Sequence, residues 1–473
     1  MSGSVSHAGQ FPLVQELGSI PDVLTVARAF ADWPYLAVLE SVKQSENLGR
    51  YSFLSADPVQ CFQQSGVQLG LEPLSPIWST LANLQTAALP DLPPFQGGAI
   101  GLLGYELGGA WERIPRAAHD EFQIPDLAVG IYDWVIAWDH QTDRAWIISQ
   151  GIPETDPEKR RLRAHQRLVE IQTRIRNISP AIERPIPVRS VTPISQHAVP
   201  KWRDITSTFS RKGYLEAVER VIEYIYAGDI FQANLSQRLL ATQSCSPLEL
   251  YGKLRQTNPA PFAGFLRWDD WFLASASPER FVQVHEGLVE TRPIKGTRQR
   301  RSRPEADLYS AAELKTSEKD QAENVMIVDL LRNDLSRVCQ SGSIRVPQLC
   351  QVENYETVQH LVSVVQGQLR DGLSAADLLR ATFPGGSITG APKIRAMEII
   401  AELEPTARGP YCGNLFWAGL DGAFDSNILI RTFVGRHGWL QCSVGGGIVA
   451  QSTPQAEYEE TWHKAEGMLR ALT

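Results

Sequence analysis

Two pairs of carboxylates, each spaced three residues apart, lie in segments with the pattern of helices. Asp320 precedes Glu323, and Glu457 precedes Glu460. Because residues three apart share one helix face, two such helices facing each other would present carboxylate oxygens to a Mg²⁺ ion, with water and an anionic substrate filling its other positions. The alternative is a helix cap for Asp320 and an exposed ion pair of Glu460 with Lys464, four residues on. The spacing alone favours the alternative.

A glycine-rich loop and a glycine run offer backbone N–H groups to an anion. The segment FPGGSITGAPKIRAMEII, residues 383–400, joins such a loop to a helix that we expect to start at Pro392. It is not a nucleotide-binding P-loop, since Ala391 and Pro392 follow Gly390 where Lys and Ser or Thr are required. Residues 445–447, all glycine, end an expected strand and would let a ligand approach the backbone. Plain tight turns are an equal alternative for both segments.

A lysine, Lys295 in ETRPIKGTRQR, lies between an apolar residue and a glycine in an expected strand. A free lysine with a pKa near 10.4 is neutral in about one molecule in 2,500 at pH 7, so a nucleophilic lysine must be desolvated or placed beside other cations. Arg292 and Arg298 are candidates for those cations. The alternative is a surface lysine, while a pyridoxal phosphate lysine has no accompanying motif here.

Two helices must position the carboxylates. In residues 316–335, Ser317 and Asp320 form a capping-box start before a broad apolar surface. In residues 452–472, Ser452 and Pro454 open a second helix. Its apolar stripe consists of Tyr458, Trp462, Ala465, Leu469 and Leu472, and its polar face carries Glu457, Glu460 and Lys464.

Several other segments of the sequence have the pattern of β-strands. Residues 262–281 predict two strands around Trp268–Asp270 that deliver Glu279 just past the second strand, and residues 427–449 repeat that layout. Nearer the N-terminus, we expect strands in residues 35–62 and 97–107, a hairpin over residues 126–149, and a charged helix over residues 157–177.

The prolines of residues 178–200 mark the main boundary. They remove backbone donors that a central strand or helix needs. The sequence therefore predicts an N-terminal region of residues 1–178, a proline-rich linker of residues 179–202 and a C-terminal region of residues 203–473.

Composition and charge exclude several classes of protein. The chain has 473 residues, 43% hydrophobic and 21% charged, as in folded globular proteins. Its 45 basic and 53 acidic residues give a formal charge of -8 without a basic run interleaved with aromatics, so we expect no nucleic-acid partner. No stretch approaches the roughly 18 apolar residues of a membrane span, and no signal-peptide pattern opens the chain, so we expect a cytoplasmic protein without membrane contact. The 6 cysteines form no CxxC pair, which predicts buried, reduced thiols.

Taken together, ordered motifs identify a family. The segments GDIFQANLSQR, SPERF, PIKGT, AENVMIVDLLRNDLSRV, YETVQHLVS, FPGGSITGAPKIRAMEII, RGPYCG, NILIRT and GGGIVAQSTPQAEYEETWHKA occur in the order typical of chorismate-utilising enzymes. The resemblance covers nearly everything from Tyr214 to the C-terminus, and more loosely the N-terminal segments VLES and GGAIGLLGYEL. It implies an α/β (α+β) fold of the anthranilate synthase component I-like type, in which two packed β-sheets are flanked by helices.

The resemblance also implies roles by position. Glu323 and Glu460 match the Mg²⁺ ligands, and Asp320 and Glu457 match the residues that hold its waters. Arg431, Tyr411, Gly446 and Gly447 match a clamp on the enolpyruvyl carboxylate, His360 and Ser387 match the ring pocket, Thr291 is placed among the substrate-binding residues, and Lys464 is expected to face the ring carboxylate. Glu279 matches the general acid that protonates the departing C4 hydroxyl, and burial suits a glutamate to that task.

Two positions distinguish the branches of the family. Water-using members carry a lysine base where this chain has Gln232, so ammonia is the expected nucleophile. Lys295 gives PIKGT where anthranilate-forming members usually read PIAGT, which implies that its amine adds at ring C2 before ammonia enters at C4. The expected product is 4-amino-4-deoxychorismate, the precursor of para-aminobenzoate and folate. Anthranilate formation is the close alternative.

The source of ammonia implies a partner. The chain has no Gly-x-Cys-x-Gly elbow for glutamine hydrolysis, and Cys412 in PYCGN follows a different pattern, so a separate glutamine amidotransferase subunit is expected in a heterodimer. A non-catalytic chorismate-binding protein is an alternative from another class, but it would need neither Glu279 nor Lys295. The VLES segment resembles the region that forms the tryptophan pocket of anthranilate synthases, and a core strand accounts equally well for Leu39.

Overall fold

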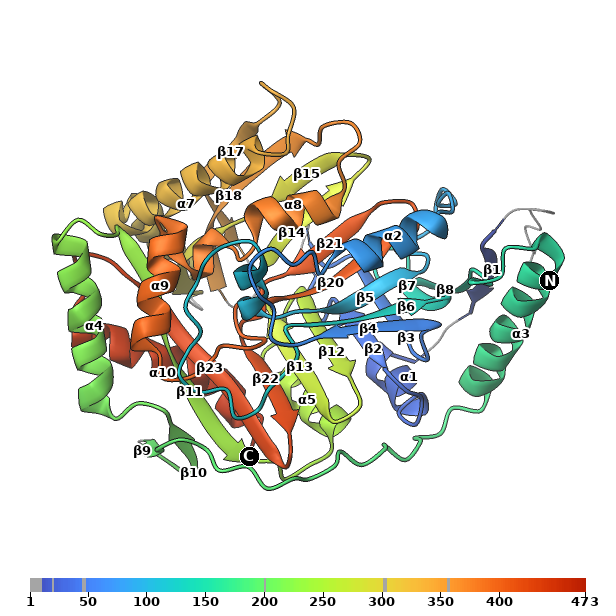
Figure 1. Ribbon diagram of the computed structural model, residues 1–473, viewed down its shortest axis with the longest axis horizontal. Helices are drawn as coiled ribbons and strands as arrows, with labels where there is room; N and C mark the ends of the chain where they lie inside the picture. The colour runs from blue at the N-terminus through green and yellow to red at the C-terminus, as the bar shows by residue number, and fades with distance from the viewer. Residues whose placement is uncertain (1–10, 19–20, 45–47, 200, 301–303, 355–357) are drawn as a thin grey trace.

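Two antiparallel sheets form the body of the molecule (Figure 1). The computed structural model describes residues 11–18, 21–44, 48–199, 201–300, 304–354 and 358–473. The first sheet has the order β1 (Leu13–Leu17), β8 (Arg144–Ser149), β7 (Trp134–Asp139), β3 (Tyr51–Ser55), β2 (Ala37–Glu40), β12 (Phe262–Arg267), β13 (Trp271–Ser277), β22 (Thr432–Arg436), β23 (Trp439–Ile448), β11 (Gln232–Thr242), β10 (Trp202–Ser207) and β9 (His197–Val199), with β19 (Gly390–Ala391) beside β11. The second has the order β16 (Ile294–Gln299), β18 (Val358–Gln368), β15 (Leu288–Thr291), β14 (Arg280–His285), β21 (Phe424–Asn427), β20 (Asn414–Gly419), β5 (Gly98–Leu103), β6 (Leu127–Tyr132) and β4 (Gln60–Gln64), with β17 (Arg345–Asn354) beside β18.

An apolar layer joins the inner faces of the sheets. Ala137 and Leu273 of the first sheet belong to one buried cluster with Ile100 and Trp417 of the second. Helices cover the outer faces, which explains why β6 and β7 are buried along their whole length and read as continuous apolar runs. The predicted two-sheet fold flanked by helices is confirmed.

The helices form two outer layers and one end of the molecule (Figure 1). Helices α1 (Val23–Ala29), α3 (Pro157–Arg176), α5 (Pro247–Thr257) and α10 (Pro454–Arg470) pack on the first sheet. Helices α2 (Ser75–Asn83), α7 (Glu318–Ser336) and α8 (Ala375–Thr382) pack on the second, with a 3₁₀ helix at Tyr105–Ala110. Helices α4 (Arg211–Tyr226) and α9 (Lys393–Leu403) enclose β11 and β23 together with α10, while α6 (Pro304–Thr316) lies against β16.

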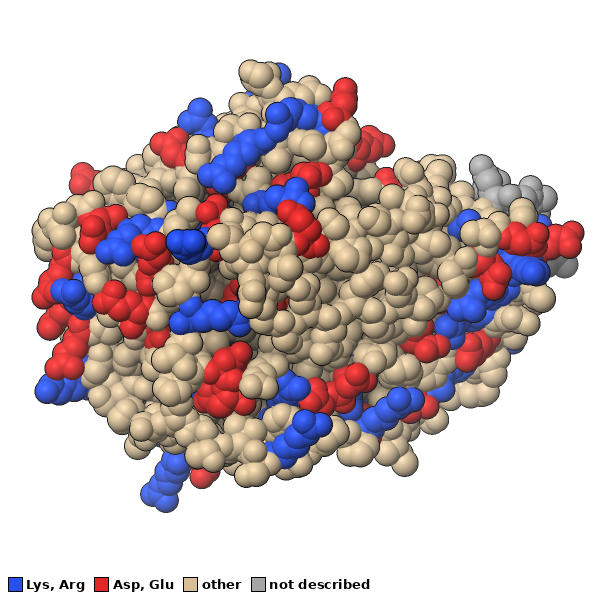
Figure 2. Space-filling view, in the orientation of Figure 1, with Lys and Arg blue, Asp and Glu red and all other residues tan. Residues whose placement is uncertain are grey.

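Local signals located the helices that matter for the site. The Ser317 hydroxyl accepts a hydrogen bond from the N–H of Asp320 at 3.3 Å, as a helix cap should, and α7 follows it. Helix α10 begins at Pro454, whereas α9 begins at Lys393, one residue after its predicted start, because Pro392 serves as its cap. The charged helix over residues 157–177 is confirmed as α3, whose charged side chains are mostly basic and lie at the end of the molecule where Figure 2 shows basic side chains on the surface.

The predicted hairpin over residues 126–149 is only half correct. Strands β7 and β8 pair as expected, but the preceding apolar run is split at Asp133, so β6 joins the second sheet and β7 the first. The buried Asp133 carboxylate lies 3.2 Å from Arg163 and 3.4 Å from Arg167 of α3. These ion pairs compensate a buried charge at the point where the chain crosses between the sheets.

Strands from both predicted regions share each sheet. Strand β2 pairs with β12, and β5 pairs with β20, so residues before and after the prolines build a common body. Residues 178–196 form no helix or strand and run along one edge of the molecule (Figure 1). The division into residues 1–178 and 203–473 stays a prediction.

No helix in the described ranges is long and apolar enough to cross a membrane. All six cysteines are free thiols, as expected, but burial applies fully only to Cys339, Cys412 and Cys442. Cys61 is exposed because its strand, β4, lies at the edge of the second sheet. The first three residues of the motif YETVQHLVS, residues 355–357, lie outside the described residues.

Candidate active site

Three segments bring an amine and a carboxyl group together. Lys295 lies in β16, Glu279 follows β13, and Ser387 lies in a short 3₁₀ helix, Gly386–Ile388, between α8 and α9. The Lys295 Nζ donates to the Ser387 carbonyl oxygen at 3.3 Å, and the Ser387 hydroxyl donates to Glu279 Oε1 at 3.2 Å. Ser387 therefore connects the two groups that the sequence proposes as nucleophile and acid.

Burial changes the proton affinity of both groups. Glu279 is 6% exposed, and burial raises its pKa to about 7 although the Lys295 charge and the Ser387 hydroxyl oppose the rise. Burial also lowers the pKa of Lys295, against the charges of Glu323 and Glu279. A carboxyl that keeps its proton near neutral pH and an amine that loses its proton more easily are suited to general acid and nucleophile.

The cation beside Lys295 is not the one expected. Arg298 donates to Asp320 Oδ2 at 3.2 Å, and Arg292 pairs with Glu353. Lys464 is the neighbouring cation that lowers the pKa of Lys295, because α10 carries it across the site from β16. Closeness in the sequence was therefore a poor guide to which cations lie near Lys295.

The carboxylates of α7 and α10 face one another across the site. Lys319 Nζ lies 3.9 Å from Glu323 Oε1 on α7 and 3.7 Å from Glu457 Oε1 on α10. Lys464 Nζ lies 2.7 Å from Glu460 Oε1, which is the ion pair that the simple helix interpretation expected. Lys319 and Lys464 thus add two ammonium groups to the site, besides the amine of Lys295.

Gly446 provides the floor beneath this cluster. A methyl group placed on Gly446 would lie 3.3 Å from Glu457 Oε2, 3.4 Å from Glu460 Oε1 and 3.5 Å from Lys464 Nζ. The Lys464 ammonium also donates to the carbonyl oxygen of Gly445 at 2.8 Å. Glycine at this position therefore lets charged groups converge on the backbone of β23.

The pKa values of the three carboxylates reflect burial and their neighbours. Burial raises the pKa of Glu323, with Lys295 and Lys319 opposing it. Burial also raises the pKa of Glu457, whose Oε1 accepts from the Ser452 hydroxyl at 2.6 Å. Burial alone would raise the pKa of Glu460, but the charge of Lys464 and its hydrogen bond outweigh burial, so the pKa of Glu460 is lowered. Cations near these carboxylates consequently favour their charged forms.

The chemistry of this cluster fits a hard divalent cation. In the part of the chain that the structure describes, no three side chains of His, Cys, Asp or Glu lie close enough together to hold a metal ion. The carboxylates nevertheless already hold a cation, since the Lys319 ammonium bridges Glu323 and Glu457. Carboxylate oxygens converging from two helices are the donors that Mg²⁺ prefers. The ligand roles of Glu323 and Glu460, and the water-holding roles of Asp320 and Glu457, stay predictions.

A guanidinium without an acidic partner lies near the imidazole of His360. Arg431 precedes β22, and no carboxylate of the described residues lies within ion-pair distance of it. Burial lowers the pKa of Arg431, which is the expected penalty for a desolvated cation that lacks an anion. Burial, helped by the Arg431 charge, also lowers the pKa of His360 to about 4. A neutral imidazole and an uncompensated guanidinium suit a carboxylate ligand.

Polar groups of β11 complete this side of the site. Gln232 is fully buried, and neither its Oε1 nor its Nε2 has a hydrogen-bond partner. A methyl group on Gly447 would lie 2.8 Å from Gln232 Nε2, so the amide faces the glycine run. The Tyr411 hydroxyl interacts with the side chain of Asn234, a residue that sequence reasoning missed. Its spacing of two from Gln232, which places both on one face of a strand, was the available signal.

Thr291 is engaged within the second sheet. Its hydroxyl donates to the carbonyl oxygen of Phe281 at 2.6 Å, and the residue is buried in β15. A hydroxyl retains acceptor capacity after donating one bond. The substrate contact of Thr291 stays a prediction.

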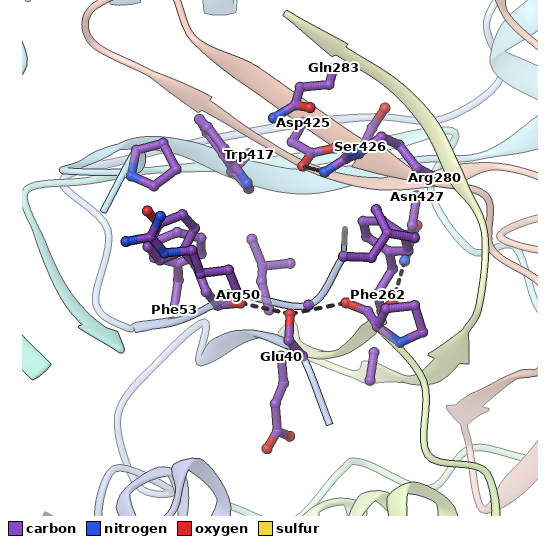
Figure 3. A pocket seen from close by; sticks show the side chains of 18 of the residues that line it. Glu40, Arg50, Phe53, Phe262, Arg280, Gln283, Trp417, Asp425, Ser426 and Asn427 are labelled. Atoms are coloured by element: carbon purple, nitrogen blue, oxygen red, sulfur yellow. Dashed lines mark hydrogen bonds and ion pairs between the residues drawn. The ribbon is translucent and has the colours of Figure 1, made fainter. Parts of the chain in front are cut away.

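A separate cavity of about 360 Å³ lies between strands of both sheets (Figure 3). Leu39 belongs to strand β2 and also lines this cavity, so it is both a strand residue and part of a pocket wall. Glu40 points away from the cavity and accepts hydrogen bonds from Tyr251 at 2.6 Å and Arg255 at 2.5 Å. Arg280, which directly follows Glu279, forms part of the opposite wall with Asp425.

Comparisons with known proteins identify the family of this chain. The chain matches the chorismate binding enzyme family over residues 38–470. It is 44% identical to an aminodeoxychorismate synthase component 1 of Klebsiella aerogenes over 85% of this chain and 83% of that protein. It is 42% identical to an anthranilate synthase component 1 of Thermus thermophilus over 81% of this chain and 79% of that protein. A crystal structure of anthranilate synthase component I from Streptococcus pneumoniae superposes with a TM-score of 0.76 at 32% identity, covering 89% of this chain and 92% of that one. This chain therefore belongs to the chorismate binding enzyme family.

Proposed function

We propose that the chain converts chorismate and ammonia into 4-amino-4-deoxychorismate. The observation that carries the proposal is Lys295, whose amine lies in a buried site beside the acid Glu279 and whose pKa burial lowers. The relative from Klebsiella aerogenes, 44% identical, is an aminodeoxychorismate synthase component 1 and supports the same reaction. This product is the precursor of para-aminobenzoate and folate, so the reaction would belong to their biosynthesis.

The first step attaches the lysine to the ring. The neutral amine of Lys295 forms a bond to ring C2, the two ring double bonds shift, and the C4–O bond breaks. Glu279 gives its proton to the departing hydroxyl, which leaves as water, and the added amine loses a proton. Protonation by a positioned acid is worth about 10²- to 10⁴-fold in rate.

The second step replaces the lysine by nitrogen. Ammonia forms a bond to C4, the double bonds shift back, and the C2–N bond breaks, which releases Lys295 as a free amine after it regains a proton. Gln232 supports ammonia over water, because a neutral amide cannot remove a proton from water as a lysine base would. The unpaired amide of Gln232 is available to orient the incoming nitrogen.

The remaining polar groups would hold chorismate. Arg431, whose pKa burial lowers, would pair with the enolpyruvyl carboxylate, together with Tyr411 and the backbone of Gly446 and Gly447. Lys464 would contact the ring carboxylate, and His360 and Ser387 would line the ring. A buried anion that pairs with an uncompensated guanidinium removes the desolvation penalty of both charges.

Mg²⁺ belongs to the proposal as a substrate-binding ion. When bound, it neutralises carboxylate charge and orients the substrate. Glu323 and Glu460 would hold it, with Asp320 and Glu457 holding its waters. Its positive charge would reduce the repulsion between the anionic substrate and the acidic side chains that hold it.

We expect Glu323→Gln and Glu460→Gln to weaken the dependence on Mg²⁺. Each substitution removes a negatively charged oxygen donor but keeps the shape of the side chain. The Mg²⁺ concentration that gives half-maximal activity should rise about tenfold or more, by analogy with lost metal-site groups. A titration of activity against Mg²⁺ measures it, and an unaltered curve would remove these ligand assignments.

Ammonia would come from a separate glutamine amidotransferase subunit. The relative from Klebsiella aerogenes is named as a component 1, which supports a second component. Cys412 is buried, and burial raises its pKa to about 12, so this thiol is poorly suited to hydrolyse glutamine. The chain alone should therefore use ammonium salts but not glutamine.

Product identity tests the proposal. The purified chain, chorismate, Mg²⁺ and ammonium chloride should yield 4-amino-4-deoxychorismate, detected as para-aminobenzoate after a lyase is added. Anthranilate synthesis is the second candidate, because the Thermus thermophilus relative is an anthranilate synthase component 1 at 42% identity. Fluorescent anthranilate as the major product would refute our assignment.

A further inference from the structure

Lys319 connects the two helices of the carboxylate cluster. It lies in the first turn of α7, and its side chain is 47% exposed. Its ammonium is within 4 Å of Glu323 on its own helix and Glu457 on α10. It is therefore a half-exposed side chain whose charged end lies between carboxylates from two elements.

The first turn of a helix is an unfavourable place for a lysine. The positive end of the helix dipole repels cations there and favours acidic residues. Ser317 already caps α7, so Lys319 contributes nothing to the cap. Its position is explained by the carboxylates of the cluster and not by the stability of α7.

We propose that Lys319 is a tethered cation that occupies the carboxylate cluster until Mg²⁺ displaces it. This inference rests on the metal site of the proposed function. Lys319 would hold Glu323 and Glu457 in place when metal is scarce, and would raise the Mg²⁺ concentration that the site needs.

Charge balance in the cluster supports displacement. Glu323, Glu457 and Glu460 face the ammonium groups of Lys319 and Lys464, and the amine of Lys295 lies close enough to Glu323 and Glu460 to act on their pKa values, so three carboxylates already face three lysines. Adding a divalent ion would produce a positive excess, whereas a long lysine side chain can move its ammonium into water at little cost. Lys464 is less free to leave, because it also donates to the carbonyl oxygen of Gly445 at 2.8 Å.

Direct metal binding to the full chain tests the inference. Mn²⁺ serves as the probe, and the free ion is measured by electron paramagnetic resonance without substrate. Lys319→Met keeps the apolar stem of the side chain and removes the charge. Mn²⁺ then no longer has to break two half-exposed ion pairs of Lys319, so the variant should bind Mn²⁺ about fivefold more tightly. Lys319→Arg keeps the charge and should bind Mn²⁺ more weakly than Lys319→Met.

Lys253→Met is the matched control. Lys253 lies on α5, is 41% exposed, and pairs with Glu249 at 3.7 Å four residues away, outside the cluster. Its replacement should leave Mn²⁺ affinity unchanged. Thermal denaturation gives a second readout, since Lys319→Met should lower the midpoint without metal and should show a larger upward shift on adding Mg²⁺ than the unchanged chain.

The outcomes separate this inference from the proposed function. If Lys319→Met binds Mn²⁺ no more tightly than the unchanged chain, Lys319 is not a competitor, while the metal site stands. If the unchanged chain binds no Mn²⁺, the metal site and the inference both fail. Tighter binding by Lys319→Met but not by Lys253→Met supports displacement.

Discussion

Replacing Lys295 by alanine is expected to reduce the formation of 4-amino-4-deoxychorismate by roughly three orders of magnitude or more, as for removal of other catalytic nucleophiles. Without the amine, no bond forms at ring C2, and ammonia would have to attack directly. The buried surroundings of Lys295 lower the pKa of that amine, so a larger fraction of it is in the neutral, nucleophilic form than for a surface lysine at the same pH. The rate of product formation with chorismate, Mg²⁺ and ammonium chloride is the measurement.

A charge-preserving variant separates bonding from electrostatics. Lys295→Arg keeps a cation beside Glu279, but a guanidinium does not lose its proton and cannot attack the ring. It should be as inactive as Lys295→Ala. Mass spectrometry of the unchanged chain incubated with chorismate but without ammonia should reveal a covalent adduct on Lys295. Unchanged turnover in Lys295→Ala would reduce this lysine to a bystander.

The helices of the site follow from local rules. Ser317 and Pro454 are start signals that act within one turn, so they predict α7 and α10 without knowledge of the rest of the chain. The hairpin of β12 and β13 is similarly local, since its strands are joined by three residues. These predictions depend only on contacts close in sequence.

Sheet order depends on distant residues and could not be predicted from patterns alone. Strand β2 pairs with β12, more than two hundred residues away, and no alternation of apolar residues specifies that partner. Asp133 shows a related difficulty. Asp133 divides one apolar run into β6 and β7. A buried aspartate at that point is explained by its ion pairs with Arg163 and Arg167 of α3, which come later in the chain.

Within the site, residue types were more predictable than neighbours. The resemblance named Lys295, Glu279 and Ser387, and the structure brings these three into contact. It did not reveal Lys319, whose spacing of four from Glu323 reads as an ordinary helix pair. The contact that matters, with Glu457, requires α10 to face α7.

Glu279→Gln is expected to lower the rate by about 10²- to 10⁴-fold, the usual contribution of a general acid. The amide keeps the size of the side chain and its bond with Ser387, but it cannot protonate the departing C4 hydroxyl. Glu106→Gln is a matched control, since burial also raises the pKa of Glu106 to about 7. Glu106 accepts the backbone N–H groups of Arg408 at 2.8 Å and Gly409 at 2.9 Å, and its replacement should leave the reaction intact.

The pH profile distinguishes an acid from a positioning residue. A general acid works in its protonated form, so with a pKa of about 7 the activity that depends on Glu279 should be present below that pH and decline as the pH rises through it. Lys295 must lose a proton, so its titration adds a rising limb, which its lowered pKa moves to a lower pH than that of an ordinary lysine. Because Glu279 and Lys295 interact, the apparent pKa values of the two limbs describe the pair and not either residue alone. The residual activity of Glu279→Gln should retain the rising limb and lose the declining one, whereas Glu106→Gln should retain both. A declining limb that persists in Glu279→Gln would assign the proton to another group, because a carboxyl that has been removed cannot titrate.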